Sequence, residues 1–528
     1  MSPGDASQAA RRPAPRRRAR LAWAAGAAAV TAVALAIWLL ISGGGGRGGL
    51  PPEPQVDPAG PAASPAARRV GRPPGRPVRV SIDVGHPGPT VPGDFIGLSF
   101  EPRNLPTLAA LARRGNLVEL LRALGPGLLR FGGVSGDKQT AWVGERARRA
   151  SWATYAIGAS DLRGLAELAS RAGWRVLLSV NLGHYDPAAA AQEISAARRA
   201  LGGELAAVAI GNEPDAYVPQ RLRSPPWDYR AYRAQADAYL AAIRSVAPGI
   251  RVAAPDASSG VPPLRWVGEE AASGHPALLT DHFYPSSSCG YKPVVSDLLS
   301  PVTRRIGASM VERLAAISRA AHTPLRVDET NSISCHGQPG VSNSFASSLW
   351  ALDYLSRAMR AGLGGVNLHD LILQPLSYSP IAGTRAQVAA GALNAEPVFY
   401  ALLVARQLEG GRFLPIGVTP AANSLSASAA LVSRGRLQVL LVDYDEPGTA
   451  PRAVHLGVPA RFFGGTVLRL RARSPAATTG VTLGGRPVGA DGRWRPAGRL
   501  PGLYGPPGGL SVGLAPSSAA LVTLYPRR

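Results

Sequence analysis

The feature that most constrains the fold is an alternation of short β-rich runs with amphipathic helical runs, which begins near residue 95. Eight such alternations predict a closed (β/α)8 barrel, an α/β fold of the TIM-barrel class. The alternative is an open doubly wound sheet, which is expected to have a glycine-rich phosphate loop after its first strand, and SFEPRNL at 99–105 contains none. The predicted strands are 96–101, 128–133, 176–183, 206–214, 251–256, 278–285, 325–331 and 365–370. The predicted helices include 108–123, 161–172, 187–201, 229–246, 303–321 and 344–361.

Polar residues gather at the ends of these predicted strands, each of which is apolar until its last two or three positions. Because the carboxyl ends of barrel strands converge on one face, where sites are built, these residues are candidates for function. For any single one the alternative is a helix cap or a turn, above all for Asp256 and Asp370. The candidates are Ser99, Glu101, Arg130, Gly133, Asn181, His184, Asn212, Glu213, Asp256, His282, Tyr284, Asp328, Glu329, Asn331, Asn367, His369 and Asp370.

The pattern changes after residue 397, where short β-rich runs are broken by turns such as GGRP and GADG. This is typical of an antiparallel β-sandwich. The run VRVSIDV at 78–84 precedes the barrel and has no helix partner, so we expect it to join the sandwich. The expected division is a barrel over 95–397 and an accessory sandwich made of 78–94 and 398–528.

The N-terminal segment carries a membrane signal. Residues 11–20 hold six arginines, and 21–41 form an uncharged run of 21 residues, long enough to cross a bilayer. We expect a basic cytoplasmic tail (1–20), a transmembrane helix (21–41) and a disordered Gly/Pro-rich linker (42–77) that holds the catalytic part outside the cell. The alternative is a signal peptide that is cleaved, with secretion of the rest.

The formal net charge of +23 is a feature that nucleic-acid-binding proteins often have. Only two of the 57 basic residues are lysines, and no basic stripe with interleaved aromatics or nucleic-acid motif is present. We therefore expect no nucleic-acid partner, and no obligate protein partner is evident.

Two cysteines, Cys289 and Cys335, occur in a chain that we expect to be exported. A disulfide that ties two loops together is the default in that setting, and two separate thiols are the alternative. The eight histidines show no H-x-x-x-H or H-x-H spacing, so we expect no metal, and no cofactor is expected either.

Two glutamates at strand ends fit glycoside hydrolysis. The retaining form of that reaction needs an acid/base and a nucleophilic carboxylate roughly 5–5.5 Å apart. Glu213, in AIGNEPD on the fourth strand, and Glu329, in LRVDETNS on the seventh, would face each other across the barrel mouth. Asn212 could bind the sugar 2-hydroxyl, while Arg130 and Tyr284 could donate to Glu329 and keep it ionised. Glu213 must stay protonated at the start of the cycle.

Residues 78–528 resemble glycoside hydrolase family 79, the β-glucuronidase and heparanase family, in its bacterial type with a C-terminal β-sandwich. The resemblance rests on SFEP (99–102), LRFGG (129–133), GNEPD (211–215), DHFYP (281–285) and, most specifically, ETNSISCHGQPGVSNSFASSLWALDYL (329–355). It implies that Glu213 is the acid/base, that Glu329 is the nucleophile, and that the substrate is a β-linked glucuronide.

The resemblance also implies that backbone amides at 335–337 bind the uronate carboxylate, so His336 and Gly337 join the candidate binding residues with Glu101 and Asn181. If Cys335 pairs with Cys289, this loop would be stapled to the one after the sixth strand. Glycine is common in the loop of heparanase-like members, whereas this chain has Cys335 and His336 there. This departure and the lack of a lysine-rich groove argue against heparan as substrate.

The main hypothesis is a retaining, exo-acting β-glucuronidase or related uronidase that needs no metal. One alternative keeps the chemistry but acts on an arabinoside, xyloside or glucoside. Another is a surface carbohydrate-binding protein whose barrel has lost catalysis.

Overall fold

The computed structural model describes residues 75–144, 149–258, 264–506 and 509–527. The expected basic tail (1–20), membrane segment (21–41) and most of the linker (42–77) lie outside them. Within the described ranges, no helix combines the length and the apolar character needed to cross a membrane.

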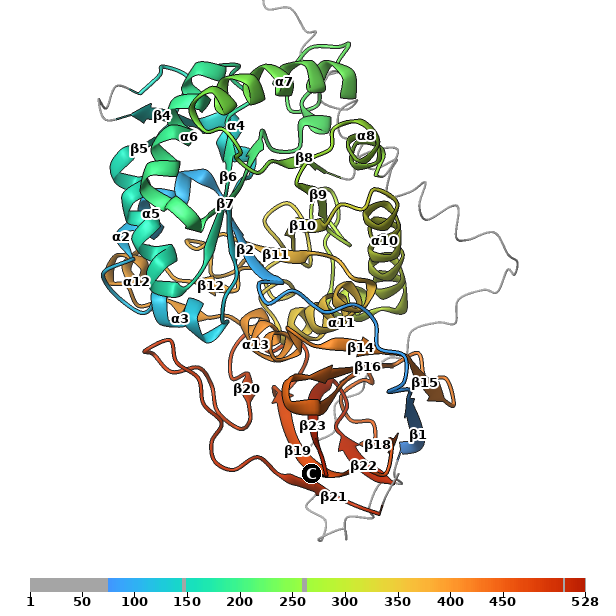
Figure 1. Cartoon of the computed structure of the whole chain (residues 1–528). Coiled ribbons are helices and arrows are strands. Elements are labelled where there is room, and N and C mark those ends of the chain that lie inside the picture. Colours follow the sequence, from blue (N-terminus) through green and yellow to red (C-terminus); the bar gives the residue numbers. More distant parts are fainter. Residues whose placement is uncertain (1–74, 145–148, 259–263, 507–508, 528) are drawn as a thin grey trace, which may run out of the picture. The chain divides into compact units, whose positions relative to one another are not determined.

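Eight parallel strands form the predicted barrel (Figure 1). Their order is β7-β6-β3-β2-β11-β10-β9-β8, and a parallel bridge between Val208 of β7 and Val252, just before β8, nearly closes the ring. Most of these strands are buried along their whole length, as parallel strands are when helices cover one face and side chains fill the other. They are β2 (Ile96–Phe100), β3 (Leu128–Phe131), β6 (Arg175–Val180), β7 (Leu205–Ile210), β8 (Ala253–Ala257), β9 (Leu278–Phe283), β10 (Leu325–Thr330) and β11 (Gly365–Asp370).

Amphipathic helices surround the strands. In α5, buried Leu162, Leu165 and Leu168 recur with helical spacing, and the helix ends at Gly173, whose φ of 74° suits glycine. The helices that accompany the barrel are α2 (Leu105–Ala110), α3 (Leu117–Ala123), α5 (Ala159–Ala172), α6 (Pro187–Leu201), α7 (Tyr229–Val246), α8 (Arg265–Ser273), α9 (Val295–Leu299), α10 (Pro301–Ala320) and α11 (Phe345–Ala361). Insertions after the strands add η1 (Pro102–Asn104), α4 (Val134–Gln139), β4 (Thr140–Gly144), β5 (Tyr155–Gly158), η2 (Gly202–Glu204), η3 (Pro214–Ala216), β12 (Ile381–Ala382), α12 (Arg385–Ala390) and β13 (Asn394–Ala395).

The prediction of one continuous helix over 108–123 is wrong, because the segment forms two short helices, α2 and α3. Gly115, at φ 74°, interrupts it where the backbone passes so close to Gly391 that a Cβ would lie 2.1 Å from the Gly391 oxygen. Asn116 then exchanges hydrogen bonds with the backbone of Leu393, at 2.8 and 3.0 Å. Tertiary contacts thus override the local helical pattern.

A polar layer fills part of the barrel interior. Asn367 donates to the carbonyls of Leu98 and Leu128 at 3.0 and 2.9 Å and accepts from Arg326 Nε at 2.5 Å. Gly97 makes room for it, since a Cβ there would lie 2.4 Å from the Asn367 side chain. Asn367 therefore holds the barrel together and belongs to its wall.

The C-terminal strands form two sheets that share one hydrophobic core. One has the order β15-β1-β18-β22, and the other β14-β16-β17-β23-β19-β20 with β21 paired to β19. They consist of β1 (Gly75–Ile82), β14 (Arg412–Leu414), β15 (Ile416–Thr419), β16 (Leu425–Val432), β17 (Arg436–Asp443), β18 (Arg452–Gly457), β19 (Phe462–Arg471), β20 (Thr482–Leu483), β21 (Gly502–Tyr504), β22 (Leu510–Leu514) and β23 (Ser518–Pro526).

One pair of these strands departs from the expected antiparallel arrangement. β1 pairs antiparallel with β15 but parallel with β18. A parallel pair needs a long connection, and here the whole barrel lies between the two strands in sequence.

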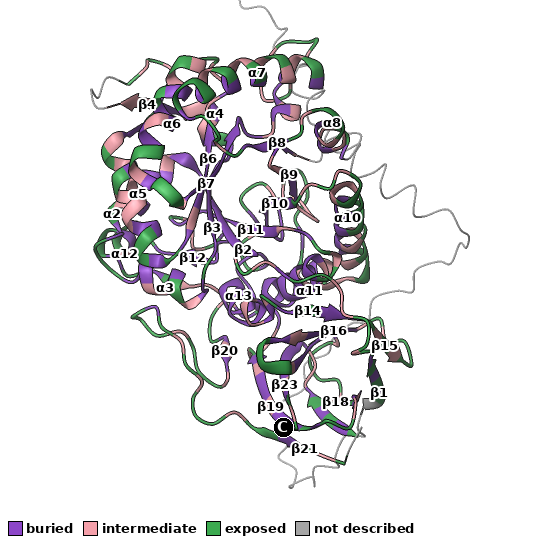
Figure 2. Cartoon of the chain, viewed as in Figure 1, coloured by how far each residue is buried: buried purple, intermediate pink, exposed green. Residues whose placement is uncertain are grey.

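Two helices join the barrel to these sheets. α11 and α13 (Pro397–Ala405) are almost wholly buried (Figure 2). Ser426 of β16 donates a hydrogen bond of 2.5 Å to Asp353 of α11. The two halves of the molecule therefore pack against each other through apolar helices.

Candidate active site

Arg130, at the carboxyl end of β3, lies at the centre of the barrel mouth and is fully buried. Its Nη1 donates to Ser99 and Glu329, both at 2.8 Å, and its Nη2 donates to Asn212 and Asp256 at 2.8 and 2.6 Å. A guanidinium fixed by this many partners acts as a rigid positive charge. It therefore orients residues from several strands at once.

Glu329, in β10, is held as a carboxylate. Tyr284, just after β9, donates to Oε1 at 3.0 Å and Arg130 to Oε2 at 2.8 Å, the two contacts expected from the sequence. His369 Nδ1, from β11, lies 3.6 Å from Oε2. Burial opposes ionisation, but the positive charge of the neighbouring histidines and of Arg130 outweighs it and lowers the pKa of Glu329 to about 2. The group is thus ionised and oriented, as a nucleophile must be.

Glu213, directly after β7, has the opposite character. Its backbone has a left-handed φ of 50°, which its amide supports by donating to the carbonyl of Asp256 at 2.8 Å. His282 Nδ1 lies 3.1 Å from Oε1. Burial raises the pKa of Glu213 despite that histidine, which favours the protonated form. An oxygen of Glu213 and one of Glu329 lie within 4.8 Å of each other.

Asp137, in α4, braces the ends of β6 and β7. One carboxyl oxygen accepts from the amides of Leu182 and Gly183 at 2.7 and 2.9 Å, and the other accepts from the Asn212 amide at 2.7 Å and from the Tyr217 hydroxyl at 2.6 Å. The segment after β7, which carries Asn212 and Glu213, is therefore anchored by a residue of the insertion that follows β3. No sequence pattern around Asp137 indicates this role.

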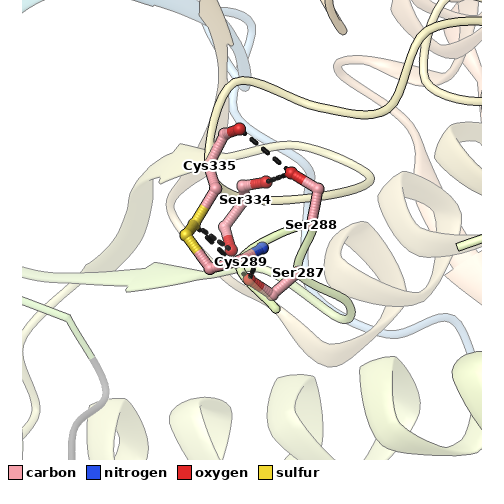
Figure 3. Close-up of a disulfide and its surroundings, with 5 residues drawn as sticks. All are labelled: Ser287, Ser288, Cys289, Ser334 and Cys335. Atoms are coloured by element: carbon pink, nitrogen blue, oxygen red, sulfur yellow. Dashed lines mark hydrogen bonds between the residues drawn. A yellow bond between two sulfur atoms is a disulfide. The ribbon is translucent and has the colours of Figure 1, made fainter. Parts of the chain in front are cut away.

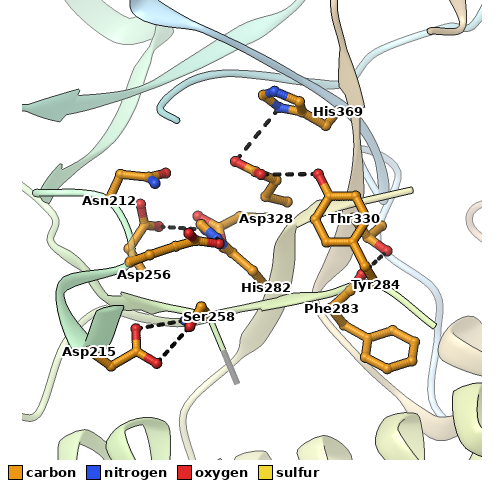
Figure 4. A network of polar contacts seen from close by, with 12 residues as sticks. Asn212, Asp215, Asp256, Ser258, His282, Phe283, Tyr284, Asp328, Thr330 and His369 are labelled. Atoms are coloured by element: carbon orange, nitrogen blue, oxygen red, sulfur yellow. Dashed lines mark hydrogen bonds and ion pairs between the residues drawn. The ribbon is translucent and has the colours of Figure 1, made fainter. Parts of the chain in front are cut away.

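Two further carboxyl groups, Asp256 and Asp328, lie beside His282 (Figure 4). Both also form ion pairs with Arg130. The strand-end pattern included both residues, but a cap or turn was the alternative for Asp256. With His282 they form a buried trio whose ligand-type atoms lie within 4.8 Å of one another, as do those of Glu213, His282 and Glu329. Arg130 Nη2 lies 3.1 Å from His282 Nε2 and 2.6 Å from Asp256, so a guanidinium already supplies the positive charge. Neither group fits a metal ion, because the cation would lie against Arg130.

A disulfide between Cys289 and Cys335 links the loop after β10 to the loop after β9 (Figure 3). This confirms the expected bond. The Ser288 hydroxyl donates to the carbonyls of Ser334 and Cys335, both at 3.0 Å. Ser377, from the loop after β11, donates to the carbonyl of His336 at 2.6 Å. Loops after three neighbouring strands are thus tied together.

The same loop has an unusual backbone. Cys335, His336 and Gly337 have consecutive positive φ angles of 59°, 67° and 81°. Gly337 is also required sterically, since a Cβ would lie 2.8 Å from the Ser342 hydroxyl. Among the contacts of the described residues, the amides of Cys335 and His336 find no acceptor.

Two other predicted residues have their polar atoms engaged by backbone. Asn181 donates to the carbonyls of Gly136 and Thr140 and accepts from the His184 amide. Glu101 accepts from the amide of Ser135 at 2.8 Å, and its other oxygen lies 3.9 Å from His369 Nε2. Glu101 therefore borders the cluster through His369, whereas Asn181 shapes the neighbouring loops.

The chain is similar to known proteins in sequence and in fold. No protein-family model matches the chain. A β-glucuronidase from Neurospora crassa is 26% identical over 390 residues, 60% of this chain and 66% of the relative. One from Aspergillus niger is 25% identical over 325 residues, 54% of this chain and 59% of the relative. The aligned part thus spans less than two thirds of either relative.

Solved structures share the fold. A 4-O-α-L-rhamnosyl-β-D-glucuronidase from Fusarium oxysporum has a TM-score of 0.68 at 19% identity, covering 84% of this chain and 100% of the other. A family 51 arabinofuranosidase from Xanthomonas axonopodis has a TM-score of 0.61 at 15% identity, covering 85% of this chain and 100% of the other.

Proposed function

We propose that this chain is a glycoside hydrolase that removes β-linked glucuronic acid by a retaining double displacement. The observation that carries the proposal is the pair Glu213 and Glu329, whose oxygens approach within 4.8 Å at the ends of the fourth and seventh barrel strands, with pKa shifts of opposite sign. A retaining pair is separated by roughly 5–5.5 Å and an inverting pair by roughly 6.5–9.5 Å. The two β-glucuronidase relatives support glucuronic acid as the sugar. The sequence motifs support our proposal that the chain belongs to family 79, with the bacterial domain arrangement.

In the first step, Glu329 attacks the anomeric carbon while Glu213 protonates the leaving oxygen. Arg130 and Tyr284 keep Glu329 ionised until it attacks. Asn212 accepts from Arg130 through Oδ1, so its NH2 group is left to donate to the sugar 2-hydroxyl. In the second step, Glu213 is a carboxylate that takes a proton from water, and this water releases the sugar from Glu329.

The loop at 335–337 is the proposed site for the uronate carboxylate. Successive backbone N–H groups in such a conformation form an anion-binding concavity. The carbonyls of Ser334, Cys335 and His336 accept from serine hydroxyls, which holds the loop in this conformation. The amides of Cys335 and His336 have no acceptor among the described residues, so they can donate to a ligand. The exposed His336 side chain stands at the same place.

We assign catalysis to the barrel (95–397) and a supporting role to the sandwich (78–94 and 398–528). We also propose that the catalytic part works outside the cell, since the disulfide fits an oxidising compartment.

The test is hydrolysis of chromogenic β-D-glucuronide beside β-D-glucoside, β-D-xyloside and α-L-arabinofuranoside, with Glu329→Gln as control. Glucuronide turnover that the control lacks supports the proposal. Turnover of a neutral glycoside instead would place the enzyme on another sugar, and inactivity on all four would contradict the assignment.

A further inference from the structure

The three residues that follow β7, Gly211, Asn212 and Glu213, have an unusual backbone. Gly211 has a φ of 79° and Glu213 a φ of 50°, both in the left-handed region. Such a φ is unfavourable for a glutamate, so neighbouring contacts must hold the segment in this shape. Because the direction of a side chain follows from its backbone, the same contacts determine where the Glu213 carboxyl points.

Backbone partners hold the first and last amides of this segment. The Gly211 amide donates to the carbonyl of the last residue of β6 at 2.9 Å, and the Glu213 amide donates to the carbonyl of Asp256 at 2.8 Å. The middle amide, that of Asn212, donates to a side chain instead, namely Oδ2 of Asp137 at 2.7 Å. Asp137 therefore completes the support of the segment.

The carboxyl group of Asp137 is enclosed by donors. Its residue is only 2% exposed. Oδ1 accepts from the amides of Leu182 and Gly183 at 2.7 and 2.9 Å, and Oδ2 accepts from the Tyr217 hydroxyl at 2.6 Å as well as from Asn212. Burial raises the pKa of Asp137, whereas these hydrogen bonds lower it. The three amides can only donate, so both oxygens accept in either protonation state.

Asn212 is fixed at two points. Its amide is held by Asp137, and its side-chain oxygen accepts from Arg130 Nη2 at 2.8 Å. The other terminal nitrogen of Arg130 donates to Glu329, also at 2.8 Å. The placement of Asn212 and of the following Glu213 relative to Glu329 therefore depends on Asp137 on one side and on Arg130 on the other.

We propose that Asp137 is a positioning residue, which fixes the backbone of Asn212 and thereby directs the Glu213 carboxyl toward the leaving oxygen. The proposal rests on the proposed function, in which Glu213 is the acid/base. Glu329 is held by partners of its own, Arg130 and Tyr284. Loss of Asp137 should therefore impair protonation of the leaving oxygen more than attack by Glu329.

The test uses Asp137→Asn. Asparagine has nearly the same shape, but its NH2 group replaces one acceptor oxygen with a donor. The Tyr217 hydroxyl can turn to accept from that NH2 group, whereas the Asn212 amide cannot, so the amide loses its acceptor. Asp353→Asn is the matched control, because Asp353 is also a buried carboxyl in a helix and accepts from Ser426 of the sandwich.

The readout is the ratio of kcat/KM for two aryl β-D-glucuronides, the 4-methoxyphenyl and the 2,4-dinitrophenyl compound. Dinitrophenolate is stable enough to leave without a proton, whereas the methoxyphenyl oxygen needs the acid. The ratio therefore reports acid catalysis, and a partly unfolded sample would lower both values alike. Glu213→Gln calibrates the assay and should lower the ratio at least about 100-fold.

Asp137→Asn should lower the ratio at least about tenfold, and Asp353→Asn should leave it unchanged. Equal losses on both substrates in Asp137→Asn would overturn the proposal and leave the proposed function standing. If Asp137→Asn does not fold, Tyr217→Phe decides, since it removes a second donor from the same oxygen: the ratio should fall about threefold, and an unchanged ratio would overturn the proposal. A wild type that hydrolyses neither compound would overturn the proposed function and this inference with it.

Discussion

Removing the Tyr284 hydroxyl tests how the barrel keeps Glu329 ionised. This hydroxyl donates to Glu329 Oε1 at 3.0 Å, and a hydrogen bond to a charged group contributes about 1.5–3 kcal/mol. Since about 1.36 kcal/mol corresponds to one pKa unit, Tyr284→Phe should raise the pKa of Glu329 by about 1–2 units, from about 2 to between about 3 and 4.

The assay is the acid limb of the pH dependence of kcat/KM on a β-D-glucuronide, which reports the free enzyme. It should move upward by about 1–2 pH units in Tyr284→Phe. Tyr400→Phe is the matched control, because Tyr400 lies in the linking helix α13 and its hydroxyl accepts a hydrogen bond from the backbone amide of Val488. An acid limb that does not move in Tyr284→Phe would refute the reasoning, even if kcat fell.

The lowered pKa of Glu329 also makes the stability of the protein depend on pH. Glu329 has a folded-state pKa below its unfolded value of 4.5, so its contribution is present above pH 4.5 and is lost as the pH falls toward 2. In Tyr284→Phe this loss should still begin near pH 4.5, but it should be smaller and should be complete between about pH 3 and 4 instead of about 2, which thermal melts between pH 2 and 6 would detect.

Three further changes act on other parts of the molecule. Burial raises the pKa of Glu193 to about 8, so its stabilising protonation is complete below pH 4.5 and is lost as the pH rises through 8. Glu193→Gln should therefore have a smaller fall in melting temperature than the wild type between about pH 4.5 and 8. Opening the disulfide by Cys289→Ser together with Cys335→Ser should raise KM for the glucuronide more than it lowers kcat, because the loop at 335–337 loses its staple; an unchanged KM would count against that loop as the carboxylate site. Gly97→Ala should lower the free energy of unfolding by about 1–3 kcal/mol in urea denaturation, because its Cβ would lie 2.4 Å from Asn367.

The barrel could be predicted from the sequence because each of its strands is a short apolar run followed by a helix with an apolar face. The meeting of the polar strand ends at one face of the barrel could be predicted for the same reason, since period and chain direction determine where those side chains emerge. The disulfide could be predicted because only Cys289 and Cys335 occur in the chain. The roles of Glu213 and Glu329 stay predictions that the geometry supports.

Other features depend on contacts between residues far apart in sequence. Gly115 breaks the predicted helix because Gly391 passes against it. From the sequence, Asp137 looks like an ordinary polar loop residue. In the structure its carboxylate accepts hydrogen bonds from the backbone amides of Leu182 and Asn212, which follow β6 and β7.

The most direct test of the central claim is mass spectrometry of the protein after incubation with an activated 2-deoxy-2-fluoro-β-D-glucuronide, which slows release of a covalent glycosyl-enzyme. The account predicts a mass increase of one sugar, mapped to the peptide that contains Glu329 and absent from Glu329→Gln. A wild type that turns over glucuronide yet accumulates no adduct, or carries it on another residue, would contradict it.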